Sequence, residues 1–420
     1  MLSIYIFTIA YDYEGCNPYF TPGIPSFPAK SEARDNAVIM TSLTDLLLLG
    51  REKDLASERG VSCTGELPEA SDPTLVARAI AARSALGSQA MVLGHHYQRD
   101  EVIQFADITG DSFKLAQAAA ENSAAEYIFF CGVHFMAESA DILTSAQQKV
   151  ILPDLAAGCS MADMATNQQV RDAWKEFERL GIASRTIPVT YMNSSAAIKS
   201  FTGENGGTIC TSSNAERAMR WAFEQGEKIF FLPDQHLGRN TAVLKLGLTL
   251  DDCVVWNPWK PNGGLADVEI SNAKVILWRG HCSVHGRFSV ENIVEVRKRI
   301  PDVQVLVHPE CQHDVVRNSD VVGSTEMIIK TVAQSPAGSK WAVGTELNLV
   351  KRLATSNPDK TVVFLDKTVC YCSTMNRIDL PHLVWAMESL AEGRLVNQIK
   401  VDEKTAHFAR VALERMLALP

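Results

Sequence analysis

Three stretches of the chain end in the same way: "KVILPDLAAGC" (149–159), "KVILWRGHC" (274–282) and "TVVFLDKTVCYC" (361–372). Each begins with an apolar run typical of a buried parallel strand, and each closes on a cysteine. A free cysteine is usually a small hydrophobic residue of the core, but these three follow their strands instead of lying inside them. In α/β proteins the carboxyl ends of the strands hold the ligand site. The pattern therefore predicts three α/β units whose cysteines meet at one site.

The sequence before each of these stretches repeats one order of elements. An opening strand ends in polar or aromatic residues, a cluster of hydroxyls precedes a helix, and a second apolar strand precedes the closing one. The three copies of each element are "MVLGHHYQ" (91–98), "IPVTYMNSS" (187–195) and "VQVLVHPEC" (303–311), then "TGDSFK" (109–114), "TSSNAE" (211–216) and "VGSTEM" (322–327), then "EYIFFCG" (126–132), "KIFFLPD" (228–234) and "KWAVGTE" (340–346). A repeat of roughly 100 residues has the size of a domain. We expect three-layer α/β/α units with short parallel sheets, related by a pseudo-threefold axis, with the active site at their common centre.

The repeat also predicts where the units begin and end. They are expected at residues 71–160, 161–282 and 283–372, and the helices of residues 373–420 are expected to complete the first unit. Residues 1–70 have no place in the repeat, so we expect an N-terminal extension that is partly disordered and carries one helix. A later start of translation is an open alternative.

The composition excludes several classes of protein. A chain of 420 residues, 46% of them hydrophobic, can bury a large core. Its formal net charge of -9 argues against a surface that binds nucleic acid. No apolar run approaches the roughly 18 residues of a membrane span, and the first residues lack the positive flank of a secretory signal. The ten cysteines are scattered, unlike a small disulfide framework. We expect a cytoplasmic protein without nucleic-acid or membrane partners.

Three converging thiolates leave two kinds of centre open. Zinc would need a fourth cysteine or histidine, or a water molecule at a catalytic site. A [4Fe–4S] cluster normally takes four cysteines, so three leave one iron open to substrate. Histidines near the same strand ends ("HH" at 95–96, "CSVH" at 282–285 and "HPECQH" at 308–313) favour an active site over a structural one.

Eight motifs, in order, resemble the quinolinate synthase family over roughly residues 75–400. They are "GHHYQRDEVIQFADITGDS" (94–112), "LAAGCSMADM" (155–164), "TYMNSSA" (190–196), "CTSSNAE" (210–216), "WRGHCSVHGRF" (278–288), "HPEC" (308–311), "VGSTEMI" (322–328) and "CSTM" (372–375) followed by Asn376. The resemblance implies a triplicated α/β/α fold with one [4Fe–4S] cluster per chain. It also implies the condensation of iminoaspartate with dihydroxyacetone phosphate to quinolinate, phosphate and water, a transferase reaction of NAD biosynthesis. A functional link to an enzyme that oxidises aspartate follows from the first substrate.

The cysteines that end the three stretches are our candidate cluster ligands: Cys159, Cys282 and Cys372. Cys370 competes for the third position, and Cys372 is preferred because the family ligand is followed by the methionine seen here as Met375. The remaining cysteines of the repeat are expected to pack or to support the site, namely Cys311 beside the active residues and Cys131, Cys210 and Cys253 as buried hydrophobes.

The opening strands supply the candidate catalytic and substrate-binding residues. His95 and Tyr97 match the family's substrate-binding His-x-Tyr. Tyr191 shares one face of an extended segment with Asn193, and together they could hold a carbonyl or carboxylate. His308 and Glu310 also alternate, and an imidazole beside a carboxylate suits acid–base chemistry, with Glu310 as the proton acceptor. The catalytic set is thus Glu310, His308 and Tyr191.

Hydroxyls at helix starts complete the predicted site: Ser112, Ser212, Ser324 and Thr325. One such residue would be an ordinary N-cap, but three clusters around one centre can bind the phosphate and carboxylates of anionic substrates. His285 matches a family histidine near the cluster and is expected to orient its neighbours. The resemblance further implies that the open iron acts as a Lewis acid that assists loss of water.

Two other functions stay open. A zinc-dependent hydrolase or aldolase would use the three cysteines and one histidine, and metal analysis would identify it. An iron–sulfur redox sensor would bind a regulator or nucleic acid without turnover, but the acidic chain has no basic segment suited to that role.

Overall fold

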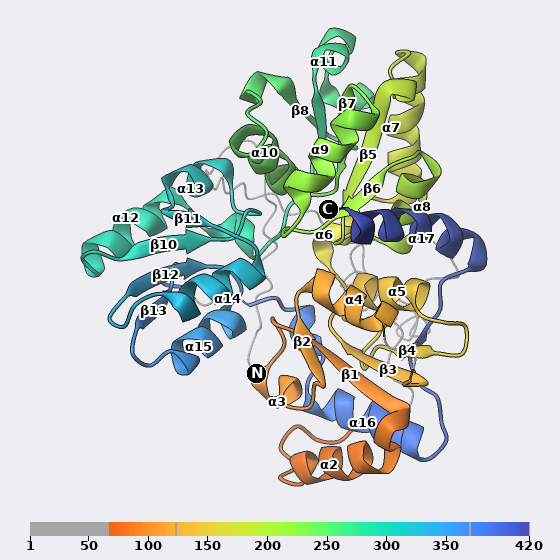
Figure 1. Ribbon diagram of the computed structural model, residues 1–420, viewed down its shortest axis with the longest axis vertical. Helices are drawn as coiled ribbons and strands as arrows, with labels where there is room; N and C mark the ends of the chain where they lie inside the picture. The colour runs from red at the N-terminus through yellow and green to blue at the C-terminus, as the bar shows by residue number, and fades with distance from the viewer. Residues whose placement is uncertain (1–66, 122–123, 369–370, 420) are drawn as a thin grey trace, which may run out of the picture. The chain divides into compact units, whose positions relative to one another are not determined.

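Three β-sheets with helices on both sides make up the described part of the chain, as Figure 1 shows. The computed structural model describes residues 67–121, 124–368 and 371–419. Residues 1–66 of the predicted N-terminal extension lie outside the described residues. Cys370 also lies outside them. In the part that is described, none of the helices combines the length and the apolar composition that a bilayer crossing requires.

The first sheet has the strand order β14-β4-β3-β1-β2. Its strands are β1 (Ala90–His95), β2 (Ile108–Gly110), β3 (Tyr127–Cys131), β4 (Lys149–Ile151) and β14 (Gln398–Ile399), and its helices are α2 (Leu75–Leu86), α3 (Asp100–Ile103), α4 (Ser112–Glu121), α5 (His134–Leu143), α6 (Ser160–Asp163) and α16 (Leu380–Ala391). All pairs are parallel except β14 with β4. The segment that ends in Cys159 continues from β4, which lies between the parallel strand β3 and the antiparallel edge strand β14.

The second sheet has the order β6-β5-β7-β9-β8, and all its pairs are parallel. Its strands are β5 (Thr186–Tyr191), β6 (Thr208–Cys210), β7 (Lys228–Leu232), β8 (Cys253–Trp256) and β9 (Val275–Trp278), and its helices are α7 (Asn167–Arg179), α8 (Ala196–Glu204), α9 (Ala215–Gln225), α10 (Gln235–Leu244) and α11 (Asp267–Asn272). Helix α7 starts with a capping box, in which Thr166 and Gln169 bond each other's backbone amides. Cys282 follows β9, the closing strand.

The third sheet has the order β11-β10-β12-β13, again with parallel pairs only. Its strands are β10 (Gln304–Val307), β11 (Val321–Val322), β12 (Lys340–Gly344) and β13 (Thr361–Phe364), and its helices are α12 (Val290–Arg299), α13 (His313–Asn318), α14 (Thr325–Gln334) and α15 (Leu347–Ser356). The opening strand β10 lies beside the second strand β12, as in the other two sheets.

One strand order therefore recurs in all three sheets: a short strand, the opening strand, the second strand and the closing strand. The predicted fold of short parallel sheets flanked by helices is confirmed. The sequence analysis missed the short strands β2, β6 and β11, because two or three residues are too few for a periodic pattern. The pseudo-threefold relation and the boundaries of the units stay predictions.

The central strands of the first two sheets are buried because their sequences are apolar on both faces. Phe129 and Phe130 in β3, and Phe230 and Phe231 in β7, are at most 1% exposed. Burying such a side chain stabilises the fold by about 1.5–3 kcal/mol. These strands lie between β1 and β4 and between β5 and β9, and the predicted site residues lie at the carboxyl ends of those neighbouring strands.

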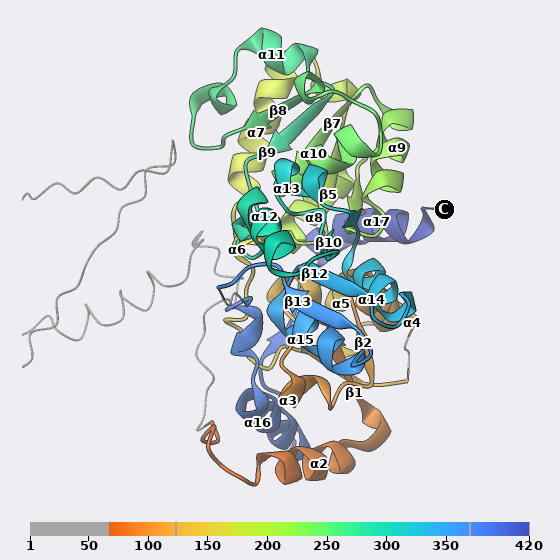
Figure 2. The ribbon, with the colours of Figure 1, turned by 90° about the vertical axis from the view of Figure 1, so that its left-hand side faces the viewer.

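The C-terminal segment ties two of the sheets together. Helix α16 packs against α2, while α17 (Glu403–Ala418) packs against α8, and both views show these pairs side by side (Figures 1 and 2). At the second contact Gly203 lets the backbones approach closely, since a Cβ there would lie 2.0 Å from the carbonyl oxygen of Phe408.

Candidate active site

A single cavity lies at the carboxyl ends of strands from all three sheets. All predicted site residues except Ser324 line it: His95, Tyr97, Ser112, Cys159, Tyr191, Asn193, Ser212, Cys282, His285, His308, Glu310, Thr325 and Cys372. Val133, Phe135 and Met136, around the start of α5, give the cavity an apolar wall. The cavity thus brings together side chains that are up to 277 positions apart in the sequence.

Three of the lining residues are the predicted ligand cysteines. Cys159 precedes the short helix α6, Cys282 follows β9, and Cys372 lies before a 3₁₀ turn that begins at Met375. Burial raises the pKa of all three thiols, that of Cys159 to about 12. Thiolates in this cavity therefore need a positive partner, such as a metal centre.

Glu310 is the hub of the polar network in the cavity. The Tyr191 hydroxyl donates to its Oε1 at 2.5 Å, and His285 Nδ1 lies 2.9 Å from its Oε2. Burial raises the pKa of Glu310, but His285 and His308 and the two hydrogen bonds outweigh this and hold its pKa below the usual range. The carboxylate is therefore ionised near neutral pH and is available to accept a proton.

Two histidines at the carboxyl ends of opening strands, His95 as the last residue of β1 and His308 directly after β10, are buried and neutral. Burial, with nearby cationic groups, lowers the pKa of His95 to about 3, and burial beside His285 lowers the pKa of His308 to about 3. The ring of His308 stacks on that of His285, with centroids 4.4 Å apart. A neutral imidazole can donate from one nitrogen and accept at the other, which suits the binding of substrate oxygens.

A family model described as "Quinolinate synthetase A protein" matches residues 79–418. The chain belongs to this family. The quinolinate synthase of Streptomyces coelicolor is 71% identical over 377 residues, which cover 89% of this chain and 96% of that protein. That of Nocardioides sp. is 67% identical over 381 residues (89% and 97%), and that of Bacillus subtilis is 54% identical over 351 residues (84% and 95%).

The hydroxyls predicted for this family member lie in different local settings. Ser112 and Thr325 are the first residues of α4 and α14, whereas Ser212 lies in the turn before α9. Ser324 does not line the cavity, and its hydroxyl accepts from the Met327 amide as the N-cap of α14. A part for Ser324 in substrate binding stays a prediction.

One buried acceptor in the cavity has no hydrogen-bond partner among the described residues. It is the side-chain oxygen of Asn193. Because an unpaired buried polar group is costly, such an atom on a cavity wall is suited to a donor from a ligand. This agrees with the substrate-binding role predicted for Asn193.

Sequence reasoning missed several polar residues of the cavity region. Asp111 and Thr211 line the cavity, and Ser213 donates to Asp111 at 3.1 Å, which joins the first two hydroxyl clusters. Thr345 lies just behind the wall and contacts two lining residues. Asp111 lies inside the motif "TGDS", so its position beside the predicted Ser112 could have indicated it. No sequence feature indicated Thr345, because the other two repeats have no hydroxyl residue at the equivalent position.

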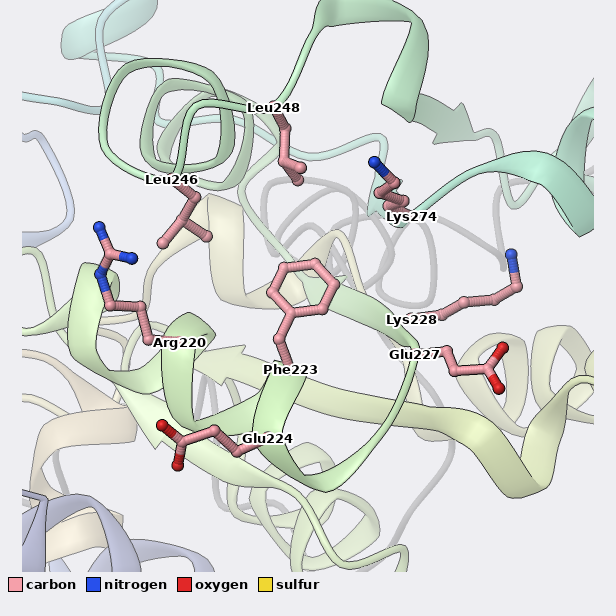
Figure 3. Close-up of a pocket in the computed structure, with 8 residues that line it drawn as sticks. All are labelled: Arg220, Phe223, Glu224, Glu227, Lys228, Leu246, Leu248 and Lys274. Carbon is pink, nitrogen blue, oxygen red and sulfur yellow. The ribbon is translucent and has the colours of Figure 1, made fainter.

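A second hollow lies at the opposite end of the second sheet (Figure 3). It is lined by Arg220, Phe223, Glu224, Glu227, Lys228, Leu246, Leu248 and Lys274, around the amino ends of β7 and β9. Its cations are engaged: Lys228 donates to two carbonyl oxygens and Lys274 pairs with Asp252. No predicted site residue lies there, so the cavity with the cysteines remains the candidate site.

The donor atoms of the cavity limit which metal centre it can hold. Among the described residues, only Cys282, His285 and Glu310 have three ligand atoms within 4.8 Å of one another. Two sulfurs bound to one zinc ion can be at most about 4.6 Å apart, since each Zn–S bond is about 2.3 Å. The three sulfurs of Cys159, Cys282 and Cys372 do not form such a group, so at least one pair of them lies further apart than two sulfurs on one zinc ion.

Proposed function

We propose that this chain is a quinolinate synthase that condenses iminoaspartate with dihydroxyacetone phosphate, releasing phosphate and water. The observation that carries the proposal is the meeting of residues from all eight family motifs around one cavity. The relatives that are 54–71% identical bear the same name. The proposal includes a cytoplasmic location and a role as a transferase of NAD biosynthesis.

A [4Fe–4S] cluster with three cysteine ligands fits the donor set. Cys159, Cys282 and Cys372 would hold it, and their spacing argues against the single zinc ion of a hydrolase or aldolase. When bound, such a cluster supplies one iron without a protein ligand, which can act as a Lewis acid.

The residues of the chain itself would bind the substrates and move protons. The hydroxyls and amides at the starts of α4 and α14 suit phosphate and carboxylate groups. Asn193 and His308 would orient the triose phosphate. Glu310 would accept a proton from a substrate carbon, because its carboxylate is ionised and held by two donors.

The first substrate constrains the metabolic context. Iminoaspartate carries a C=N bond that an amino acid gains only by oxidation, so the chain would work beside an enzyme that oxidises aspartate. Because the other enzyme carries out the oxidation, the proposed reaction needs no redox step on this protein.

The test is the purification of the full chain without oxygen, followed by iron, zinc and acid-labile sulfide analysis and a quinolinate assay. We expect about four irons and four sulfides per chain and formation of quinolinate from the two substrates. Cys372→Ala should lose the cluster, whereas Cys311→Ala should keep it, because the buried Cys311 thiol does not line the cavity. One zinc without sulfide, or a loaded protein that forms no quinolinate, would contradict the proposal.

A further inference from the structure

A side chain that belongs to the second sheet's helices binds the turn that carries Glu310. The side-chain amide of Asn240, on α10, donates to the carbonyl oxygen of Pro309 at 2.8 Å and to that of Cys311 at 2.9 Å. These two residues flank Glu310 in the loop after β10. Asn240 is buried and does not line the cavity. Its influence on Glu310 therefore runs through the backbone of the turn.

The orientation of the Asn240 amide follows from its three partners. A carbonyl oxygen only accepts, so both N–H bonds of Nδ2 point at the turn and Oδ1 points away from it. Oδ1 lies 2.8 Å from Nδ1 of His313, the first residue of α13. Because an amide oxygen cannot donate, this imidazole nitrogen carries the proton of the bond. Both donors of Asn240 are thus used within the protein, and neither is left for a ligand.

The peptide groups on both sides of the Glu310 Cα are held in place. The preceding peptide contains the Pro309 carbonyl, which Asn240 binds. Its N–H also points at His308 Nδ1, at the longer distance of 3.4 Å. The following peptide contains the Cys311 amide, which donates to the His308 carbonyl at 3.0 Å. Because a peptide group is planar, fixing these two planes fixes the direction in which the Glu310 side chain leaves the backbone.

We propose that Asn240 is a positioning residue that fixes the turn around Glu310 and so sets the direction of its carboxylate. The inference rests on the proposed function, in which Glu310 takes a proton from a substrate carbon. A shift of the turn would move the carboxylate away from its donors Tyr191 and His285 and out of line with the substrate. A misplacement of about 1 Å in a reacting group can lower the rate about 100-fold.

The partners of Asn240 favour this role over the capping of a helix. Asn357 shows the ordinary case, because this buried residue follows α15 and its amide donates to the Leu353 carbonyl four positions earlier. Asn240 instead lies within α10 and binds carbonyls that are 69 and 71 positions away. Its hydrogen bonds therefore stabilise one turn of another sheet's loop and not the helix to which it belongs.

The test compares Asn240→Leu, which has a similar size and no N–H, with Asn357→Leu. The second variant is the matched control, because it makes the same change at a buried asparagine that does not line the cavity. Both full chains are purified without oxygen, with their clusters. Hydrogen–deuterium exchange of the peptide that covers residues 308–313 reports on the turn. Calorimetric titration with dihydroxyacetone phosphate gives the Kd and the number of binding sites, and kcat is expressed per site.

We expect Asn240→Leu to exchange faster over residues 308–313 and to lower kcat per site at least about 10-fold, with a smaller change in Kd. Asn357→Leu should match the wild type in all three measurements. A purely structural role would lower the number of binding sites and leave kcat per site unchanged. Asn240→Asp, which keeps the shape and loses the N–H bonds, replaces the leucine variant if that variant does not fold, with Asn357→Asp as its control.

Every other outcome decides against the proposal or against the function on which it rests. Exchange at the wild-type rate, a wild-type kcat per site, or equal effects of the two variants would overturn the role of Asn240 and leave the proposed function standing. A wild type that forms no quinolinate would overturn the proposed function. The exchange experiment then tests the turn alone: faster exchange only in Asn240→Leu supports its fixation by Asn240, and equal exchange overturns it.

Discussion

The carboxylate of Glu310 is held by two donors that a neutral amide could not satisfy in the same way. Tyr191 and His285 each donate to one of its oxygens, whereas a glutamine offers one acceptor oxygen and turns an NH₂ group towards the other donor. Replacement of Glu310 by glutamine would therefore remove the carboxylate that we propose as the proton acceptor, without a change in the size of the side chain.

Glu310→Gln should lower kcat by at least about 100-fold, which is the range for loss of a general base. The iron content and the visible absorbance should stay at the wild-type level, because Glu310 is not a predicted ligand of the cluster. Steady-state quinolinate formation and an absorbance spectrum measure the two effects. The exposed Glu178 on α7 offers a control, since Glu178→Gln should change neither. Near-normal turnover in Glu310→Gln would show that another group accepts the proton.

At the scale of an element, helix α15, which flanks the third sheet, supports the loop that follows strand β1 of the first sheet. Arg352 on α15 donates to the backbone carbonyls of His96 and Gln98 and to the Asp100 carboxylate. These contacts hold the loop that carries His95 and Tyr97. The helix thus positions two residues predicted to bind substrate that it does not itself contain.

Arg352→Gln should raise KM several-fold while the cluster content stays constant, because the loop loses its support but keeps its residues. Hydrogen bonds to charged groups contribute about 1.5–3 kcal/mol when they are buried, and this guanidinium is partly exposed. We therefore expect the free energy of unfolding to fall by about 1–2 kcal/mol in urea titrations. Lys351→Gln, at an exposed position of the same helix, should leave both quantities unchanged; equal effects of the two variants would contradict the role of Arg352.

The contact of α8 with α17 depends on the absence of one side chain. A Cβ at Gly203 would meet the Phe408 backbone, which cannot move without shifting α17. Gly203→Ala should therefore lower the free energy of unfolding by about 1–3 kcal/mol, as overpacking does, measured by urea denaturation. Glu204→Ala on the same helix removes only a surface ion pair with Arg171 and should cost less than about 1 kcal/mol. A Gly203→Ala protein as stable as the wild type would mean that the two helices can separate freely.

For the molecule as a whole, the features that can be predicted from the sequence are those that occur in every repeat or that have a strong hydrophobic pattern. The apolar strands and the cysteines that follow them were predicted because each motif occurs three times. Contacts that depend on tertiary structure were not: Arg352 binds a carbonyl 256 positions away, and Thr345 meets Tyr97 only because two sheets share a cavity. Short strands such as β11, with two residues, carry no pattern of their own. Position at the end of a strand is therefore a better guide to this site than residue type.

The buried histidines of the cavity make the stability of the whole fold depend on pH. Burial is the first cause that lowers the pKa of His95 and His308 to about 3, whereas an unfolded imidazole titrates near pH 6.5. Between these values the unfolded chain binds protons that the folded chain does not, so lowering the pH favours unfolding. We expect the melting temperature to fall steadily from pH 7 to pH 5. His95→Asn should weaken this dependence, while His407→Gln, at an exposed site, should not; an unchanged slope in His95→Asn would show that His95 is protonated in the folded protein.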